Sequence, residues 1–195
     1  MKQEKHEIYF KDKKCETVVD IPEKKDISDL AEMYKHWVLL SDLLQEHDCR
    51  RVNVPEFSEI LFCYVMDCWR CNNIKCPGIK STSFDCYNPK THKTIQVKAT
   101  SVGEDLTSFG PRSQWDELYL MNFFCDEEYN GSFTIYQIPA DKIYNTMVNQ
   151  NETLAQKQKT GQRPRFSIMK KIIEPDNIKP IGKFNVYDLK KLKEI

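Results

Sequence analysis

The chain has no long apolar run and no secretory signal. Hydrophobic residues make up 40% of its 195 residues and charged residues 30%, which is the composition of a soluble globular protein. A membrane-spanning helix needs about 20 consecutive apolar residues, so the sequence predicts no such helix and a cytoplasmic location is expected. The length suits one domain with a sizeable core, and we expect residues 1–195 to form a single domain.

The cysteines do not form the pattern of a disulfide framework. All eight are irregularly spaced and accompany no secretory feature, so we expect reduced, mostly buried thiols. Four of them follow the pattern Cys68-x2-Cys71-x4-Cys76-x9-Cys86. The first pair has the spacing of zinc ligands but the second pair does not repeat it, so a structural zinc site remains an alternative.

Acidic residues are scarce in two segments, although the formal net charge of the whole chain is zero. Residues 68–103 contain six Lys or Arg residues and one acid, Asp85. Residues 153–173 contain six Lys or Arg residues and no acid. Because a solvated surface usually mixes its charges, both segments predict contact with a polyanion, and Asp85 is suitably placed for a metal ion beside it.

Asp85 lies in the first strand of a predicted β-hairpin, within residues 83–87. Residues 94–99 alternate between polar and apolar side chains, which is the period of a half-buried strand, and Asn88-Pro89 starts a turn. A simple hairpin centred on this turn brings Asp85 opposite Gln96 and puts Lys98 on the same face. We therefore expect a carboxylate, an amide carbonyl and an ammonium group to lie within reach of one another.

This combination of side chains is the one that phosphodiester hydrolysis needs. Carboxylate and carbonyl oxygens bind a divalent cation, while a nearby positive group orients the attacking water and offsets the charge that builds on phosphorus. The three residues therefore predict a metal-dependent nuclease centre. The alternative is an ordinary hairpin, in which lysine and glutamine lie on the solvated face and aspartate precedes the turn.

The spacing Asp85-x10-Gln96-x-Lys98 resembles the signature of the PD-(D/E)XK nuclease superfamily, with Phe84 in place of the proline and Gln96 in place of the second acid. Glutamine at that position is a known variant in some heteromeric transposases and some restriction enzymes, although a neutral carbonyl is a weaker metal ligand than a carboxylate. Residues 55–170 more broadly resemble small type II restriction endonucleases that cut GCNGC. The segments that carry this broader resemblance are Lys80–Asn88, Ile95–Thr100 and Leu106–Tyr119.

The resemblance implies a restriction-endonuclease-like fold, which is an α/β fold with a mixed central β-sheet flanked by helices. It also implies Mg²⁺-dependent double-strand cleavage of DNA at a palindrome, and hence a homodimer with two active centres. A companion DNA methyltransferase is implied as well. Two alternatives remain: a repair, recombination or transposition nuclease with the same core, and a non-catalytic DNA-binding module.

Two helices are predicted before the hairpin. The first begins at Asp26 or Ser28 and ends near His47, and its apolar stripe predicts core packing or, if exposed, a dimer interface. The second begins after Asn53, with Pro55 in its first turn. Residues 1–26, which are highly charged, are expected to form a peripheral strand or arm.

Glu59 lies among apolar residues of the second predicted helix, and a buried carboxylate needs a partner. The resemblance implies a glutamate from a helix just before the catalytic hairpin, so we expect Glu59 to bind the cation together with Asp85 and Gln96. The alternative is an exposed acid that the helix dipole favours, which describes Glu56 better.

Residues 108–116 are predicted to form a loop, which either anchors Trp115 in the core or clamps DNA phosphate through Ser108, Arg112 and Gln114. Ser113 and Asp116 have the spacing of a helix capping box. Further along, we expect a hairpin of residues 118–124 with 132–138, a short helix over 141–148, and a peripheral strand with a Lys-rich tail over 174–195.

The basic segment 153–173 contains residue types that read base edges. Arginine pairs with guanine in the major groove, and glutamine pairs with adenine or contacts phosphate. Gly161 and Pro164 should break a helix and expose a loop. We expect this segment to recognise DNA, unless it is only a solvated charged face. The candidate contacts are Lys157, Gln162, Arg163 and Arg165.

Overall fold

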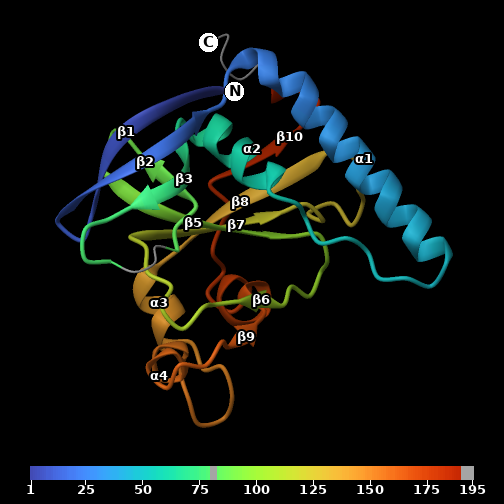
Figure 1. The fold of residues 1–195 in the computed structure, drawn as a ribbon. Coiled ribbons are helices and arrows are strands. Elements are labelled where there is room, and N and C mark those ends of the chain that lie inside the picture. Colours follow the sequence, from blue (N-terminus) through green and yellow to red (C-terminus); the bar gives the residue numbers. More distant parts are fainter. Residues whose placement is uncertain (80–82, 190–195) are drawn as a thin grey trace.

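The structure is a computed structural model that describes residues 1–79 and 83–189. Its centre is a mixed sheet of eight described strands in the order β1-β2-β3-β4-β5-β7-β8-β10 (Figure 1). Neighbouring strands are antiparallel except for β5 and β7, which are parallel. The strands are β1 (Lys2–Phe10), β2 (Lys13–Ile21), β3 (Trp69–Lys75), β4 (Cys86–Asn88), β5 (Lys93–Thr100), β7 (Glu117–Asn122), β8 (Ser132–Ile138) and β10 (Gly182–Asn185).

Helices cover both faces of this sheet, so the predicted mixed α/β fold class is confirmed (Figure 1). On one face, α1 and α2 pack on a core that includes Ile95 and Val97 of β5. On the other face, a second core joins Leu118 and Leu120 of β7 to α3, α4 and a π-helical turn. The helices are α1 (Ile27–Glu46), α2 (Phe57–Met66), α3 (Ala140–Asn145) and α4 (Leu154–Lys159), with a 3₁₀ turn at Lys24–Asp26 and a π turn at Met169–Ile173.

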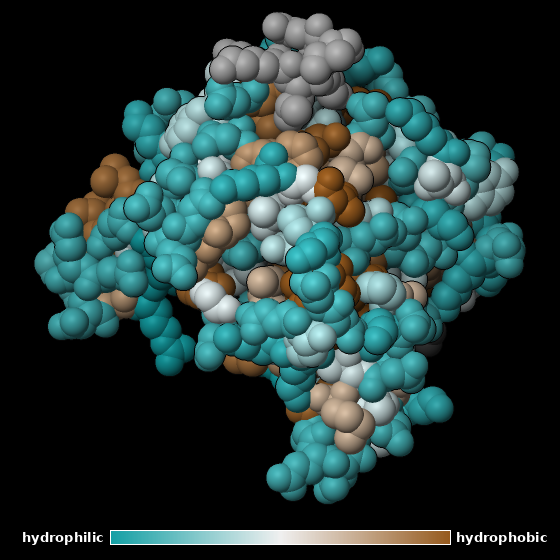
Figure 2. All heavy atoms as spheres, turned by 180° about the vertical axis from the view of Figure 1, so that it is seen from behind, coloured by the Kyte–Doolittle hydropathy of each residue, from teal (hydrophilic) through white to brown (hydrophobic). Residues whose placement is uncertain are grey.

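Both helices that were predicted before the hairpin are confirmed. In α1, the predicted stripe packs in the core through Leu30, Tyr34 and Trp37, which are nearly inaccessible to solvent. Met33 of the same stripe is half exposed, as are Leu39, Leu40 and Leu43. The rear surface in Figure 2 is mostly hydrophilic and is interrupted by small apolar patches. Within the described residues, no helix is long and apolar enough to cross a membrane.

Residues 1–26, expected to be a peripheral strand or arm, form the hairpin β1–β2 at the edge of the sheet. The hairpin is closely attached, because β2 pairs with β3 and Ile8 and Val19 are completely buried. The expectation that every cysteine is a reduced thiol is wrong for Cys15 and Cys76, which form a disulfide between β2 and the end of β3. The two chain segments lie side by side in the sheet, and no sequence spacing reveals this.

The disulfide also removes Cys76 from the proposed zinc pattern. Cys63 and Cys86 lie in contact as buried free thiols, with their sulfur atoms 3.2 Å apart. Among the described residues, no group of three or more His, Cys, Asp or Glu side chains is arranged to hold a metal ion. The structure therefore gives no support to the zinc alternative.

The capping box predicted for Ser113 and Asp116 is wrong, because residues 117–122 form strand β7 and not a helix. The Asp116 carboxylate instead accepts hydrogen bonds from the backbone N and the Oγ1 of Thr94, each at 2.8 Å, and so joins the start of β7 to β5. The predicted pairing of β7 with β8 is confirmed. The predicted helix over 141–148 is shorter and one residue earlier, and the end of the Lys-rich tail, residues 190–195, lies outside the described residues.

Candidate active site

Strands β4 and β5 separate at Asp85. Their register pairs Cys86 with Ile95, and the Asp85 backbone N donates to the Ile95 carbonyl at 2.9 Å. The next step in this register brings Asp85 opposite Gln96, as the sequence predicts. At this position a side chain takes part in joining the two strands. The Val97 backbone N donates to Oδ2 of the Asp85 side chain at 2.8 Å. The carboxylate therefore lies between the two diverging strands.

Gln96 contacts Asp85 directly. Its side chain is 5% exposed, and its Nε2 donates to Oδ2 of Asp85. The same nitrogen lies 3.3 Å from the Val97 carbonyl oxygen. A half turn of the amide exchanges its nitrogen and oxygen positions, and the oxygen would then face the same corner. Gln96 is thus placed to donate to a bare carboxylate or to offer an oxygen ligand beside it.

Lys98 lies two residues further along the same face of β5, within electrostatic reach of both predicted acids. Burial lowers the pKa of its ammonium group, the charges of Asp85 and Glu59 raise it, and the charge of Arg163 lowers it. Its Nζ lies 6.0 Å from the centre of the Phe109 ring. The three residues of the predicted motif, Asp85, Gln96 and Lys98, therefore lie near Glu59 at the point where β4 and β5 separate. We call this cluster of four residues the corner.

The electrostatics of this corner suit an added cation. Burial, followed by the charge of Glu59, raises the pKa of Asp85 to about 7, although the Val97 N–H, Lys98 and Arg70 act in the opposite direction. A carboxylate that is hard to ionise beside a second carboxylate is a site where extra positive charge is favourable. Carboxylate and amide oxygens are also the ligands that Mg²⁺ prefers. The donor set therefore fits a hard divalent cation.

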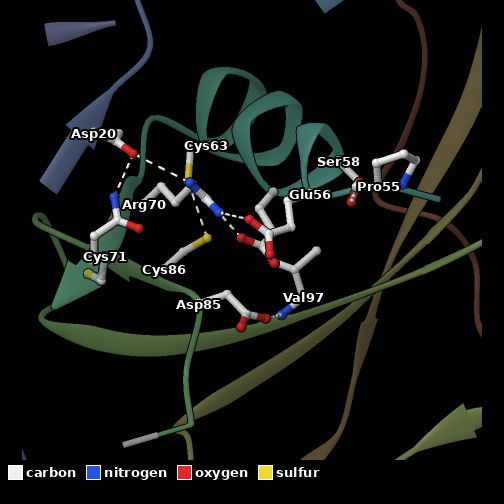
Figure 3. A network of polar contacts seen from close by, with 12 residues as sticks. Asp20, Pro55, Glu56, Ser58, Cys63, Arg70, Cys71, Asp85, Cys86 and Val97 are labelled. Atoms are coloured by element: carbon white, nitrogen blue, oxygen red, sulfur yellow. Dashed lines mark hydrogen bonds and ion pairs between the residues drawn. The ribbon is translucent and has the colours of Figure 1, made fainter. Parts of the chain in front are cut away.

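Glu59 lies in the first turns of α2 and faces β3, where Arg70 is its partner. The Arg70 Nε donates to Oε2 of Glu59 at 2.8 Å. Burial raises the pKa of Glu59, and Arg70 opposes this shift. Figure 3 shows the Arg70 side chain between Asp20 of β2 and Glu56 beside α2, and both of these acids also form ion pairs with it. Both glutamates considered from the sequence thus bind one arginine.

Sequence reasoning missed Arg70. It is one of the six basic residues of segment 68–103, but strand β3 was not predicted, so no position could be given to it. A usable signal was present: Trp69 and Cys71 alternate with Arg70 and Asn72, and the structure puts the first pair against one core and the second pair beside Asp20.

Two distant segments, residues 105–116 and 153–169, form one unit, which we call the recognition lobe after the DNA contacts that the sequence predicts for it. Strands β6 (Thr107–Ser108) and β9 (Arg165–Phe166) pair within it, and the Phe109 backbone N donates to the Pro164 carbonyl at 3.1 Å. Figure 1 shows the lobe on the side of the sheet away from α1.

Asp105 holds the two segments together. Its carboxylate accepts hydrogen bonds from the backbone N of Ile168 and Met169 and from the hydroxyls of Thr107 and Ser167. Sequence reasoning missed this residue, because its partners Ser167, Ile168 and Met169 lie more than sixty residues further along the chain.

The recognition lobe exposes most of the predicted DNA contacts. Helix α4 ends at Lys159, and Gly161 has a φ of +75°, so the predicted break and loop are confirmed. The Lys157 ammonium group pairs with Glu152 at 2.5 Å, and the Ser108 hydroxyl is buried without a hydrogen-bond partner among the described residues. Trp115 is buried, so this loop does anchor it in the core. The exposed candidates are Arg112, Gln114, Gln162, Arg163 and Arg165.

Comparison with known proteins identifies the family. The family model of the Bsp6I restriction endonuclease matches residues 22–175, a span that includes the hairpin β4–β5, α2 and the recognition lobe. The type II restriction enzyme Bsp6I of Bacillus sp. (strain RFL6) is 33% identical over 175 residues, which cover 88% of this chain and 94% of that protein. No solved structure matches the chain. The protein belongs to the Bsp6I restriction endonuclease family.

Proposed function

We propose that the protein is a type II restriction endonuclease that makes sequence-specific double-strand breaks in DNA by Mg²⁺-dependent phosphodiester hydrolysis. The observation that carries this proposal is the corner at which β4 and β5 separate, where Asp85 contacts Gln96 and lies within electrostatic reach of Lys98 and Glu59. Membership of a restriction endonuclease family supports DNA as the substrate.

Glu59, Asp85 and Gln96 would hold the cation, with the Val97 carbonyl as a further oxygen ligand. When bound, Mg²⁺ supplies positive charge that polarises the phosphate and makes attack by water easier. The Asp85 carboxylate is fixed for this role by the Val97 N–H. Gln96 contributes a neutral ligand, and Glu59 supplies the second negative charge from α2.

Lys98 would orient the attacking water and stabilise the charge that develops on phosphorus. The oxygen of water forms a bond to phosphorus as the bond to the 3′ oxygen breaks. Cleavage would thus leave a 5′-phosphate and a 3′-hydroxyl. The half-buried position of Lys98 supports this role, because electrostatic interactions are stronger where water is excluded.

The recognition lobe would hold DNA beside this corner. Arg163 and Arg165 are proposed to contact base edges together with Gln162, since all three are exposed, Gln162 and Arg163 on the loop after α4 and Arg165 at the start of β9. Arg163 is also close enough to lower the pKa of Lys98, which supports a short distance between recognition and cleavage. Contacts to phosphate are proposed for Ser108, Arg112, Gln114 and Lys157.

The favoured recognition sequence is GCNGC, on the resemblance of the motifs. A palindrome presents equivalent phosphates on its two strands, so we propose a homodimer with one active centre for each strand. A companion DNA methyltransferase would protect the host DNA at the same sequence.

The experiment is to digest DNA of known sequence with the purified protein and Mg²⁺, and to map every end. We expect ends at GCNGC alone, with 5′-phosphates and no cleavage when EDTA replaces Mg²⁺. Ends at unrelated sequences, or nicks that depend on DNA structure, would contradict sequence-specific restriction. DNA binding without cleavage in any divalent metal would contradict the nuclease assignment itself.

A further inference from the structure

Arg70 is bound by three acids from three parts of the chain. Its Nε donates to Glu59 at 2.8 Å, its Nη2 contacts Glu56, and its Nη1 lies 3.4 Å from Oδ2 of Asp20. The Arg70 side chain is 16% exposed, whereas that of Glu56 is 79% exposed. The inner contacts to Glu59 and Asp20 are therefore the ones shielded from water, where an ion pair has its largest effect.

Asp20 links this arginine to the N-terminal hairpin. The Asp20 carboxylate, on β2, accepts a hydrogen bond from Asn72 Nδ2 at 2.6 Å and from Gln3 Nε2 at 2.8 Å. It is thus fixed by both neighbouring strands before it contacts Arg70. The planar guanidinium group can hold Asp20 and Glu59 at the same time, since its donors point in fixed and different directions.

Glu59 depends on this arginine for its position. A carboxylate in an apolar helix face is costly without a positive partner, and the side chain would otherwise turn toward solvent. Glu59 must stay near Asp85 to act as a ligand in the proposed function. Among the described residues, Arg70 is the one cation that forms an ion pair with Glu59.

We propose that Arg70 is a positioning residue of the nuclease centre, which holds the Glu59 carboxylate toward Asp85 and connects it through Asp20 to the N-terminal hairpin. This inference rests on the proposed function for the role of Glu59 as a ligand. The N-terminal hairpin β1–β2 would then contribute to catalysis, because its residue Asp20 contacts Arg70 and Arg70 in turn contacts Glu59.

The first test measures Mn²⁺ binding to the free protein, with no DNA and no turnover, by counting unbound Mn²⁺ in electron paramagnetic resonance spectra. Loss of a group that orients a metal ligand typically weakens affinity about 10–100-fold, and we expect Arg70→Ala to fall in this range. In a Glu59→Gln background, Arg70→Ala should have little further effect, because the group it positions is already gone. Unchanged or tighter Mn²⁺ binding by Arg70→Ala would overturn the proposal, as would full additivity of the two substitutions.

The second test separates positioning from folding in the cleavage reaction. We expect Arg70→Ala to lower kcat about 10–100-fold with little change in KM for DNA, and guanidinium ion at millimolar concentration to restore part of the rate. Arg70→Lys should keep more activity than Arg70→Ala. Arg50→Ala, at an exposed position outside this network, is the matched control and should cleave normally.

The two tests distinguish failure of the proposed function from failure of the role proposed for Arg70. If the wild type does not cleave DNA, the proposed function fails, and Mn²⁺ binding still decides whether Arg70 positions Glu59. If the wild type cleaves and Arg70→Ala has normal kcat, the role of Arg70 alone is overturned. A loss of rate that guanidinium and lysine both fail to restore, together with a lowered melting temperature, would mean that Arg70 is only structural.

Discussion

The corner around Asp85, which is the proposed active centre, and the recognition lobe use charge in opposite ways. In the corner, Asp85, Glu59 and Arg70 have partners within the protein, and burial moves the pKa of both acids upward. In the lobe, Arg163 and Arg165 are exposed and form no ion pair within the described residues. The corner is therefore organised before any ligand binds, whereas Arg163 and Arg165 are open to solvent. A substitution in the corner should abolish chemistry, and one in the lobe should change which DNA is bound.

The largest effect is expected from Asp85→Ala. This change removes the carboxylate that joins Val97 and Gln96, and we expect cleavage to fall below detection. DNA binding, measured by gel shift with Ca²⁺ in place of Mg²⁺, should persist because the lobe is unchanged. Normal turnover by this variant would eliminate Asp85 as the principal ligand and remove the contrast between the two regions.

Substitutions in the recognition lobe should change which DNA sequences the protein binds. Arg163→Ala or Arg165→Ala should each cost about 1–3 kcal/mol in discrimination between cognate and mismatched DNA. Lys157→Ala is the control: it should weaken all sequences alike and only slightly, because Lys157 already pairs with Glu152. Competition binding on the two DNAs measures both quantities. Equal losses on cognate and random DNA for both arginines would reduce the lobe to an electrostatic anchor.

The free energy of unfolding should depend on pH because Asp85 is an ionisable group that is largely buried in the corner. The pKa of Asp85 is raised from 3.8 to about 7, so the folded protein binds more protons than the unfolded chain between these values. The contribution of Asp85 to the free energy of unfolding therefore falls as pH rises from about 4 to 7 in the absence of metal.

In the proposed site Mg²⁺ would compete with the proton on Asp85, so it should raise the melting temperature more at pH 8 than at pH 6, and the cleavage rate should rise through pH 7. Thermal unfolding with and without Mg²⁺ measures the first effect. If Mg²⁺ raised the melting temperature equally at both pH values, and did so in Asp85→Ala as well, the metal would bind at a site that does not include Asp85.

The smallest effect in the corner is expected from Gln96→Glu. This change replaces the proposed neutral oxygen ligand by a charged one of nearly the same shape, so at least partial Mg²⁺-dependent cleavage should remain. The added charge near Asp85 and Glu59 should also tighten cation binding, which Mn²⁺ titration of the free protein measures. Loss of both fold and cleavage would mean that the amide of Gln96 is structural.

Local sequence patterns predicted the parts of this site that depend on neighbouring residues. The period of residues 94–99 and the turn at Asn88 were enough to bring Asp85 opposite Gln96. The same kind of signal predicted α1, α2 and the exposed loop around Gly161.

Contacts between distant segments could not be predicted in this way. Arg70 meets Glu59, eleven residues earlier, because β3 folds back beside α2, and Asp105 contacts Ser167, Ile168 and Met169 more than sixty residues further along the chain. Asp116 fits a helix cap by spacing, yet the buried strand β7 follows, and its carboxylate bonds Thr94 instead. In each case tertiary packing decided which partners the side chain has.

One measurement tests the central claim most directly, namely that this corner forms the nuclease centre and that one copy serves each strand. Supercoiled plasmid with a single GCNGC site is digested by wild-type protein and by a mixed dimer in which one subunit carries Lys98→Ala. We expect linear DNA from the wild type and accumulated open circles from the mixed dimer, because one active centre cuts one strand. Linear product at the wild-type rate from the mixed dimer would contradict this account.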